Sequence, residues 1–149
     1  MKQIHLLIFI SIALLIFSSF KVQKGEIFSL TVEVKDLQNS KGVVQFALYN
    51  KEGTIPDENY KKCYKILKEK IQNGLSKVTF ISLPMGKYAV NILHDENENG
   101  KIDKGFILPI EGVGFSNYQS VGLTNRPNFS KASFELMENK TINIKVIYM

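Results

Sequence analysis

Cysteine, tryptophan and arginine are scarce in this chain, and each shortage excludes a class of feature. Cys63 is the single cysteine, so no internal disulfide can form, and a small packed side chain is its expected role. Tryptophan, the usual sugar-stacking residue, is missing, which disfavours a carbohydrate platform built on tyrosines alone. Arg126 is the one arginine and the lysines are dispersed, so no concentrated nucleic-acid-binding face is predicted.

The N-terminal residues 1–20 are predicted to be a secretory signal peptide. Lys2 precedes an apolar run at 6–17, and two serines follow it. This layout is typical of signal peptides, and the run is shorter than the roughly 20 apolar residues that span a membrane. An uncleaved anchor is the alternative, since no clean small-x-small site is present. Cleavage would leave residues 21–149 as one secreted or periplasmic domain, free of the membrane, with a net charge of 18 − 14 = +4.

After the signal, apolar and polar residues alternate with period two, which predicts short β-strands. The alternating segments are 28–35, 43–49, 75–83, 87–93, 134–136 and 142–148. Within 75–83 we expect Val78, Phe80 and Ser82 on one face. Turn-forming Asn, Gly and Pro separate the segments, and no βαβ rhythm is present. The sequence therefore predicts an all-β protein, an antiparallel Ig-like or prealbumin-like β-sandwich of about seven strands.

The segment before Asn73-Gly74 is compatible with two structures. Tyr60, Tyr64 and Leu67 follow helical spacing, whereas an Asn-Gly pair before a strong strand is a hairpin signal. We predict a helical turn over 58–64, leading into a hairpin arm at 66–72.

Residues 95–130 form the one long stretch without clear periodicity, and it contains many Gly, Asn and Pro residues. Its aromatic side chains argue for packing rather than disorder. Long ordered loops in compact domains are commonly functional. Gly112 and Gly114 within it are expected to permit close backbone packing.

Oxygen-bearing side chains recur at alternate positions where this stretch begins. They fall on positions 1, 3, 5 and 9 of a calcium loop, with Gly100 at position 6. Position 12 is Phe106 instead of the bidentate Glu, so the loop is not part of an EF-hand. The candidate ligands are the side chains of Asp95, Asn97, Asn99 and Asp103 and the main-chain carbonyl of Lys101.

Calcium is the predicted cation, because amide and carbonyl oxygens suit its loose coordination better than that of magnesium. Two carboxylates make a weak structural site unless Glu111 or a loop carbonyl joins, comparable to extracellular modules with dissociation constants of roughly 10⁻⁴–10⁻³ M. The alternative is an Asx-rich turn that caps its own backbone N–H groups without metal. Gly100 and Asp103 favour calcium, since both fall on calcium-loop positions.

Residues that could support catalysis have plainer explanations. His94 has no second histidine outside the signal peptide and is expected to be a strand-end side chain hydrogen-bonded to the loop. Ser116 lacks the flanking glycine pattern of a nucleophile elbow. Tyr88, after Pro84-Met85-Gly86, is expected to anchor a corner between two strands.

Four motifs in order resemble a known bacterial family, the domain of unknown function 2141. They are Leu83-Pro-Met-Gly-Lys-Tyr-Ala-Val90, His94-Asp-Glu-Asn-Glu-Asn-Gly-Lys-Ile-Asp103, Glu111-Gly-Val-Gly-Phe-Ser-Asn117 and Pro127-Asn-Phe-Ser-Lys-Ala132. The resemblance covers nearly all of the chain after the signal. It implies an exported single-domain protein whose Pro-Gly-x-Tyr turn is similar to that of prealbumin-like and collagen-binding-type sandwiches. The family has no assigned activity.

The sequence favours a non-catalytic, monomeric, exported binding or surface-associated module with an unknown ligand or partner, stabilised by calcium. One alternative is a small-ligand carrier of prealbumin-like fold, which requires an apolar cavity. A less favoured alternative is a hydrolase acting at 94–117 through His94, Asp95 and Glu111, for which no nucleophile is identifiable.

Overall fold

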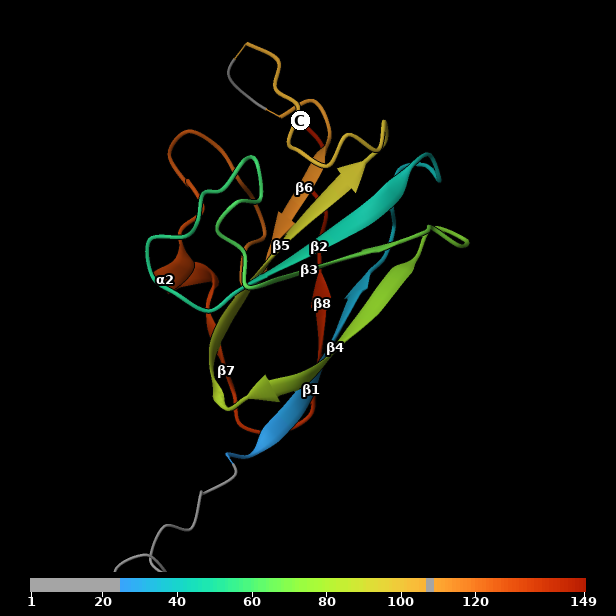
Figure 1. Cartoon of the computed structure of the whole chain (residues 1–149). Helices are drawn as coiled ribbons and strands as arrows, with labels where there is room; N and C mark the ends of the chain where they lie inside the picture. The colour runs from blue at the N-terminus through green and yellow to red at the C-terminus, as the bar shows by residue number, and fades with distance from the viewer. Residues whose placement is uncertain (1–24, 107–108) are drawn as a thin grey trace, which may run out of the picture.

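The computed structural model describes residues 25–106 and 109–149, so the predicted signal peptide lies outside the described residues. Eight strands and one short helix follow in order (Figure 1). They are β1 (Ile27–Val34), β2 (Val43–Tyr49), β3 (Lys65–Glu69), β4 (Ser76–Pro84), β5 (Gly86–Asp95), β6 (Gly112–Phe115), α2 (Phe129–Ala132), β7 (Phe134–Leu136) and β8 (Lys140–Ile144). Within these ranges no helix is long and apolar enough to cross a membrane.

The strands form two sheets that face each other, as predicted for a β-sandwich. One sheet has the order β4-β1-β8, and the other has the order β3-β2-β5-β6 with β7 also paired to β5. All pairs are antiparallel except β1 and β8, which run parallel. The expectation of an antiparallel fold is thus correct for every pair but this one. The parallel pair arises because the chain crosses from β7 in one sheet to β8 in the other before running alongside β1.

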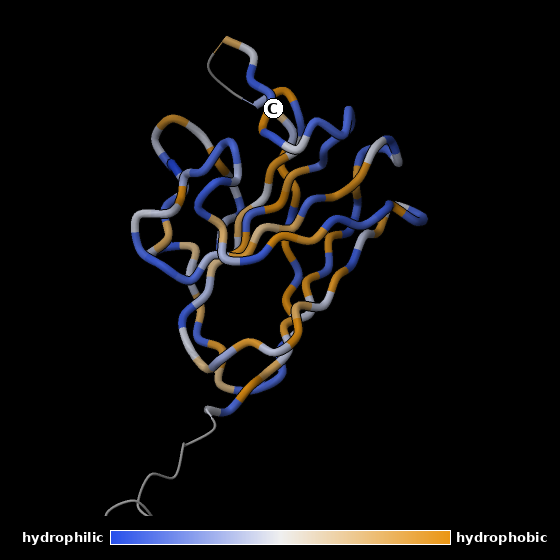
Figure 2. Tube along the Cα trace, in the orientation of Figure 1, coloured by the Kyte–Doolittle hydropathy of each residue, from blue (hydrophilic) through white to orange (hydrophobic). Residues whose placement is uncertain are grey.

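The main core lies between the sheets and is built by alternate residues. Leu30 and Val32 of β1 face Phe46 of β2 and Ile92 of β5, and all four are fully buried. Figure 2 shows the hydrophobic stretches that run along the strands. The predicted corner is confirmed, since the Tyr88 hydroxyl donates to the Pro84 carbonyl oxygen at 2.9 Å.

The five-stranded sheet is also covered on its other face, which we call the outer face. Ala47, Tyr49 and Leu93 point this way and are fully buried beneath the connections 50–64 and 116–132. Both faces of β2 and β5 therefore bury apolar side chains, and the loops form a third layer. The candidate site lies in this loop layer.

The segment 58–72 differs from its prediction. Residues 58–64 contain no helix, because the buried Asp57 carboxylate accepts the N–H groups of Lys61 and Lys62 and organises an irregular turn. The Asn73-Gly74 turn exists, with positive φ at both residues. Its two arms nevertheless part, since β3 pairs with β2 whereas β4 pairs with β1. The turn carries the chain from one sheet to the other.

Two further details correct the predicted strand pattern. Ser82 has φ 55° and is exposed, because a bulge opposite Phe28–Leu30 shifts the register and gives the inner position to Leu83. The strand predicted over 142–148 ends at Ile144, after which Ile147 pairs with Val113 across the sheets through hydrogen bonds of 2.8 and 3.0 Å.

The long connection after β5 contains β6, whose glycines permit this crossing. A Cβ on Gly114 would lie 2.6 Å from the Lys145 carbonyl oxygen, and one on Gly112 would lie 2.4 Å from the Tyr148 ring. The predicted close packing at both glycines is confirmed.

Candidate functional site

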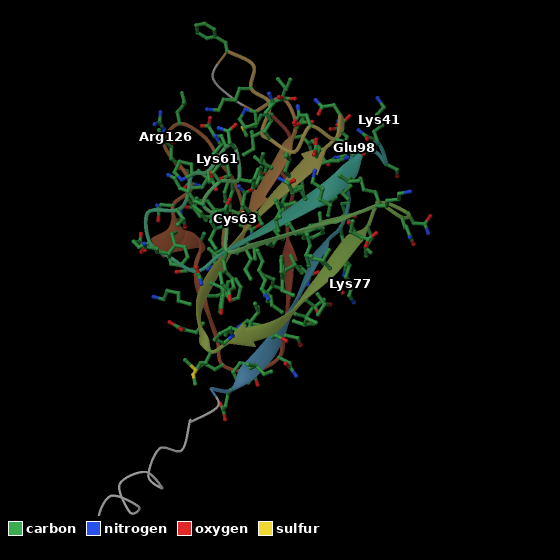
Figure 3. All side chains as sticks on the ribbon, in the orientation of Figure 1. Lys41, Lys61, Cys63, Lys77, Glu98 and Arg126 are labelled. Atoms are coloured by element: carbon green, nitrogen blue, oxygen red, sulfur yellow. The ribbon has the colours of Figure 1, made fainter. Side chains whose placement is uncertain are left out.

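The predicted cation loop begins at Asp95, the last residue of β5, and the Asp95 side chain holds the loop together. The Asp95 side chain is fully buried, Oδ1 accepts the Asn99 N–H at 3.0 Å, and Oδ2 accepts the Gly100 N–H at 2.9 Å. The exposed Glu98 has φ 59° and projects from the loop at the same end of the molecule as Lys41 (Figure 3). Asp95 therefore uses both oxygens to hold the backbone.

Asn97, Asn99 and Asp103 come together on the solvent side of the loop. The side-chain amide nitrogens of Asn97 and Asn99 donate to Asp103 Oδ2 at 2.7 and 2.6 Å. Their amide oxygens accept backbone N–H groups, from Asn99 and Lys101 respectively, both at 3.0 Å. The hydrogen bond from Asn97 lowers the pKa of Asp103, helped by Asn99 and by the charge of Lys101.

Glu111 enters the site from the residue before β6. Its side chain is 6% exposed, Oε1 accepts the Glu96 N–H at 3.1 Å, and Oε2 has no hydrogen-bond partner in the described part of the chain. Burial raises the pKa of Glu111, hydrogen bonds from the backbone N–H groups of Asp103 and Glu96 oppose this rise, and the negative charges of Asp103 and Asp95 add to it. Backbone N–H groups therefore compensate the Glu111 carboxyl only in part, and Oε2 stays buried without a hydrogen-bond partner in the described part of the chain.

Three residues from other elements complete the surroundings, and the sequence did not predict them. Lys68 of β3 places Nζ 3.4 Å from Asp95 Oδ2, and Gln45 of β2 donates to the Gly100 carbonyl oxygen at 3.4 Å. The Tyr60 hydroxyl is buried without a partner among the described residues, and burial raises its pKa. The polar Gln45 inside an apolar strand could have indicated a role in the site from the sequence alone. Lys68 could not, because only the pairing of β2 with β3 brings it beside Gln45.

The described ranges contain no group of three or more His, Cys, Asp or Glu residues arranged to hold a metal. The predicted ligand set has only two carboxylates, those of Asp95 and Asp103. Both oxygens of the Asp95 carboxylate accept backbone N–H groups. A half-turn of the Asn97 and Asn99 amides would exchange nitrogen for oxygen beside Asp103, and it would break the hydrogen bonds that their oxygens accept from the backbone N–H groups of Asn99 and Lys101. With Glu111 included, the atoms available to bind a metal would then all be hard oxygens, which suit calcium or magnesium and not a transition metal.

His94 does not share this site. Neighbouring residues of a strand point to opposite faces, so His94 faces the space between the sheets while Asp95 faces the loop layer. His94 Nε2 lies 3.0 Å from the Lys41 carbonyl oxygen, to which it donates, and Nδ1 lies 2.7 Å from the Tyr148 hydroxyl. The expected structural role is thus correct, but the expected partner is wrong, because His94 binds Lys41 and Tyr148 and not the loop that follows it.

Ser116 is likewise engaged in the fold. Its buried hydroxyl accepts the Val90 N–H at 2.9 Å and donates to the Ala132 carbonyl oxygen at 2.6 Å. His94 and Asp95 of the hydrolase alternative thus lie on opposite faces of β5, and the Ser116 hydroxyl joins β5 to α2.

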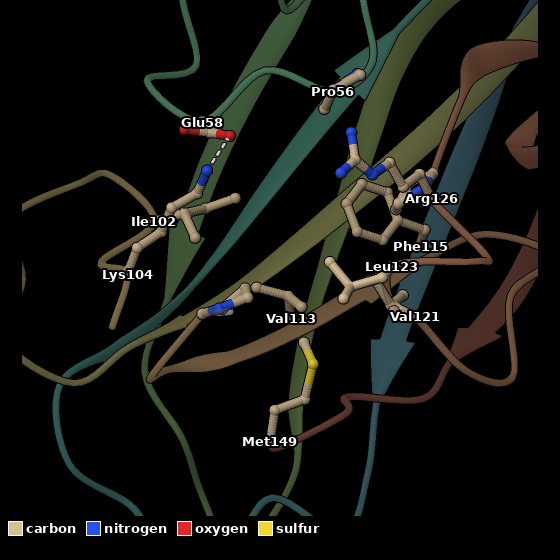
Figure 4. A pocket seen from close by; sticks show the side chains of 13 residues that line it. Pro56, Glu58, Ile102, Lys104, Val113, Phe115, Val121, Leu123, Arg126 and Met149 are labelled. Carbon is tan, nitrogen blue, oxygen red and sulfur yellow. Dashed lines mark hydrogen bonds and ion pairs between the residues drawn. The ribbon is translucent and has the colours of Figure 1, made fainter. Parts of the chain in front are cut away.

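A pocket of about 230 Å³ opens beside the cation loop on the outer face (Figure 4). Ile102 and Lys104 reach it from the end of the cation loop, Pro56 and Glu58 from the 50–64 connection, and Arg126 from the 116–128 connection. The cation loop and the pocket therefore share the wall formed by residues 102–104.

Residues 32–145 match the model of a family described as "Uncharacterized protein conserved in bacteria" (DUF2141). The chain belongs to this family. The resemblance expected from the four motifs is confirmed. No curated protein and no solved structure matches the chain. DUF2141 is a bacterial family without a described activity, so membership by itself does not assign a function to the chain.

Proposed function

We propose that this DUF2141 protein is an exported, non-catalytic binding module whose 95–103 loop is stabilised by one calcium ion. The proposed ligands are the side chains of Asp95, Asn97, Asn99 and Asp103, the carbonyl of Lys101, and Glu111. The export part of the proposal rests on the apolar N-terminal sequence, which lies outside the described residues.

The buried Glu111 Oε2 is the observation that carries the cation proposal. An Asx-rich turn without metal accounts for Asp95, Asn97 and Asn99, because each accepts a backbone N–H of the loop. It does not account for the buried Glu111 Oε2, which has no hydrogen-bond partner among the described residues and lies close enough to Asp103 and Asp95 for their charges to act on the Glu111 carboxyl. Burying an unpaired charge is costly, and a divalent cation supplies the missing partner.

Glu111 also supplies what the sequence lacked at position 12 of the loop. That position is Phe106, which is fully exposed and has no oxygen side chain to offer. Glu111 lies further along the chain but returns to the loop, because the Ile110 N–H donates to the Asp103 carbonyl oxygen at 3.0 Å. A carboxylate from this return can play the part that the terminal Glu plays in an EF-hand.

Thermal unfolding of the purified protein in EDTA, in calcium and in magnesium tests the proposal. With a dissociation constant of roughly 10⁻⁴–10⁻³ M, about 10 mM calcium stabilises the fold by about 1.4–2.7 kcal/mol, or roughly 4–12 °C in Tm. Magnesium should give a smaller shift. Glu111→Gln should remove the calcium shift.

Glu138→Gln is the matched control, because Glu138 is exposed in the turn between β7 and β8, away from the loop layer. It should keep the full calcium shift. A wild-type Tm that does not change with calcium, or an unchanged shift in Glu111→Gln, would refute the proposal.

A further inference from the structure

We infer that the pocket beside the cation loop binds a small organic carboxylate, with its apolar body on β6 and its carboxylate on Arg126. The inference deepens the proposed binding role by naming a ligand class, and it does not depend on calcium.

The shape of the pocket limits the size of its occupant. Its volume of about 230 Å³ lies below the range of about 300–1,000 Å³ typical of sites for drug-sized ligands. Val113 and Phe115 of β6 form an apolar floor, and both are almost fully buried. Further apolar side chains line the pocket, among them Pro56, Ile102, Val121, Leu123 and Met149. The occupant is therefore a small molecule with an apolar body.

The wall that carries Arg126 is held in place before any ligand arrives. The buried Tyr118 hydroxyl donates to the Arg126 carbonyl oxygen at 3.3 Å and accepts the Asn128 N–H at 3.1 Å. The opposite wall is tied by the Ile102 N–H, which donates to the Glu58 carbonyl oxygen at 3.0 Å. A preformed site loses less conformational entropy on binding than one that must order its loops.

The charges at the rim select an anion. The Lys104 ammonium is paired with the Glu58 carboxylate (dashed line in Figure 4). No acidic side chain among residues 25–106 and 109–149 pairs with the Arg126 guanidinium, which lies above Phe115 in the same view. A planar guanidinium beside an apolar floor is suited to a carboxylate, to which it donates two parallel hydrogen bonds.

Titration of ¹⁵N-labelled protein with three probes of equal chain length tests the inference: hexanoate, hexanol and hexylamine. EDTA is present throughout, so the outcome is separate from that of the cation site. Hexanoate should shift the amide signals of Ile102, Val113 and Arg126 and saturate with a dissociation constant on the order of a millimolar, as expected for so small a ligand. Hexanol should bind at least about fivefold more weakly, since it forms no charge-assisted hydrogen bond with Arg126. Hexylamine should cause no saturable shift.

Arg126→Gln should reduce hexanoate binding to the level of hexanol. Lys41→Gln removes an exposed positive charge well away from Arg126 in Figure 3 and should leave binding unchanged. Equal binding of hexanoate and hexanol, saturable shifts elsewhere only, or full hexanoate binding by Arg126→Gln would overturn the inference. Calcium binding without hexanoate binding would refute only the pocket, and the reverse would refute only the cation site.

Discussion

The Lys68 ammonium nitrogen lies 3.4 Å from Asp95 Oδ2, and so a cation of the protein itself stands beside the carboxylate that begins the proposed calcium loop. The Asp95 side chain is buried, whereas the Lys68 side chain is 43% exposed and extends from the edge strand β3. Lys68 can therefore compete with calcium or move away when the ion binds.

Replacing Lys68 with Met should strengthen calcium binding. Removing a positive charge lowers the electrostatic cost of placing a divalent ion next to Asp95, and a partly exposed pair of this kind is worth up to about 1 kcal/mol, or about fivefold in affinity. Calcium titration monitored by Tm would measure the effect. Lys51→Met removes an exposed lysine just after β2 and should change nothing. Weaker calcium binding by Lys68→Met would contradict this prediction.

Asp95 and Asp103 should respond differently to replacement by Asn. Asp95→Asn should destabilise the fold by about 1–3 kcal/mol with or without calcium, because a buried acceptor of backbone N–H groups is lost. Asp103→Asn should alter stability little in EDTA but abolish the calcium shift, because Asp103 is partly exposed and binds two flexible amides. Chemical denaturation in both conditions separates the two. A calcium shift that survives in Asp103→Asn would exclude Asp103 as a ligand.

Glu111 should impose a characteristic pH dependence in EDTA. Its raised pKa means that the folded protein holds this proton more tightly than the unfolded chain does. The group therefore favours folding below its unfolded pKa, and this contribution is lost as pH rises through the folded pKa. The stability of Glu111→Gln minus that of the wild type should grow over this rise, as measured by denaturation at a series of pH values. A difference that stays constant with pH would show that the pKa of Glu111 is not raised in the folded protein.

The crossing of the chain between the sheets should depend on Gly114. A Cβ at Gly114 would meet the Lys145 carbonyl oxygen, so Gly114→Ala should destabilise the fold by about 1–3 kcal/mol or more. Gly122→Ala is the control, because nothing lies within 4 Å of its Cβ position, and it should stay within about 0.5 kcal/mol of the wild type. Urea denaturation compares them. Equal stability of the two variants would show that β6 can move away from the segment 145–149 that follows β8.

Local patterns in the sequence were sufficient for most strands and for the loop, and non-local pairings account for what they missed. The alternation in β1 and the Pro84–Tyr88 corner are properties of neighbouring residues, and the spacing from Asp95 to Asp103 is equally local. The partner of β3 and the parallel pairing of β8 depend on residues far along the chain. Lys68 and Tyr60 likewise reach the site through contacts between segments far apart in the chain. No short-range pattern specifies that β3 leaves β4 to pair with β2.

Calorimetric titration of the purified protein with calcium, set beside the same titration of Glu111→Gln, tests the central claim most directly. We predict one ion per chain with a dissociation constant of roughly 10⁻⁴–10⁻³ M, and no saturable heat for Glu111→Gln. Wild-type protein that gives no saturable heat at about 10 mM calcium, ten times the upper end of that range, would contradict the account. So would identical binding by the two proteins.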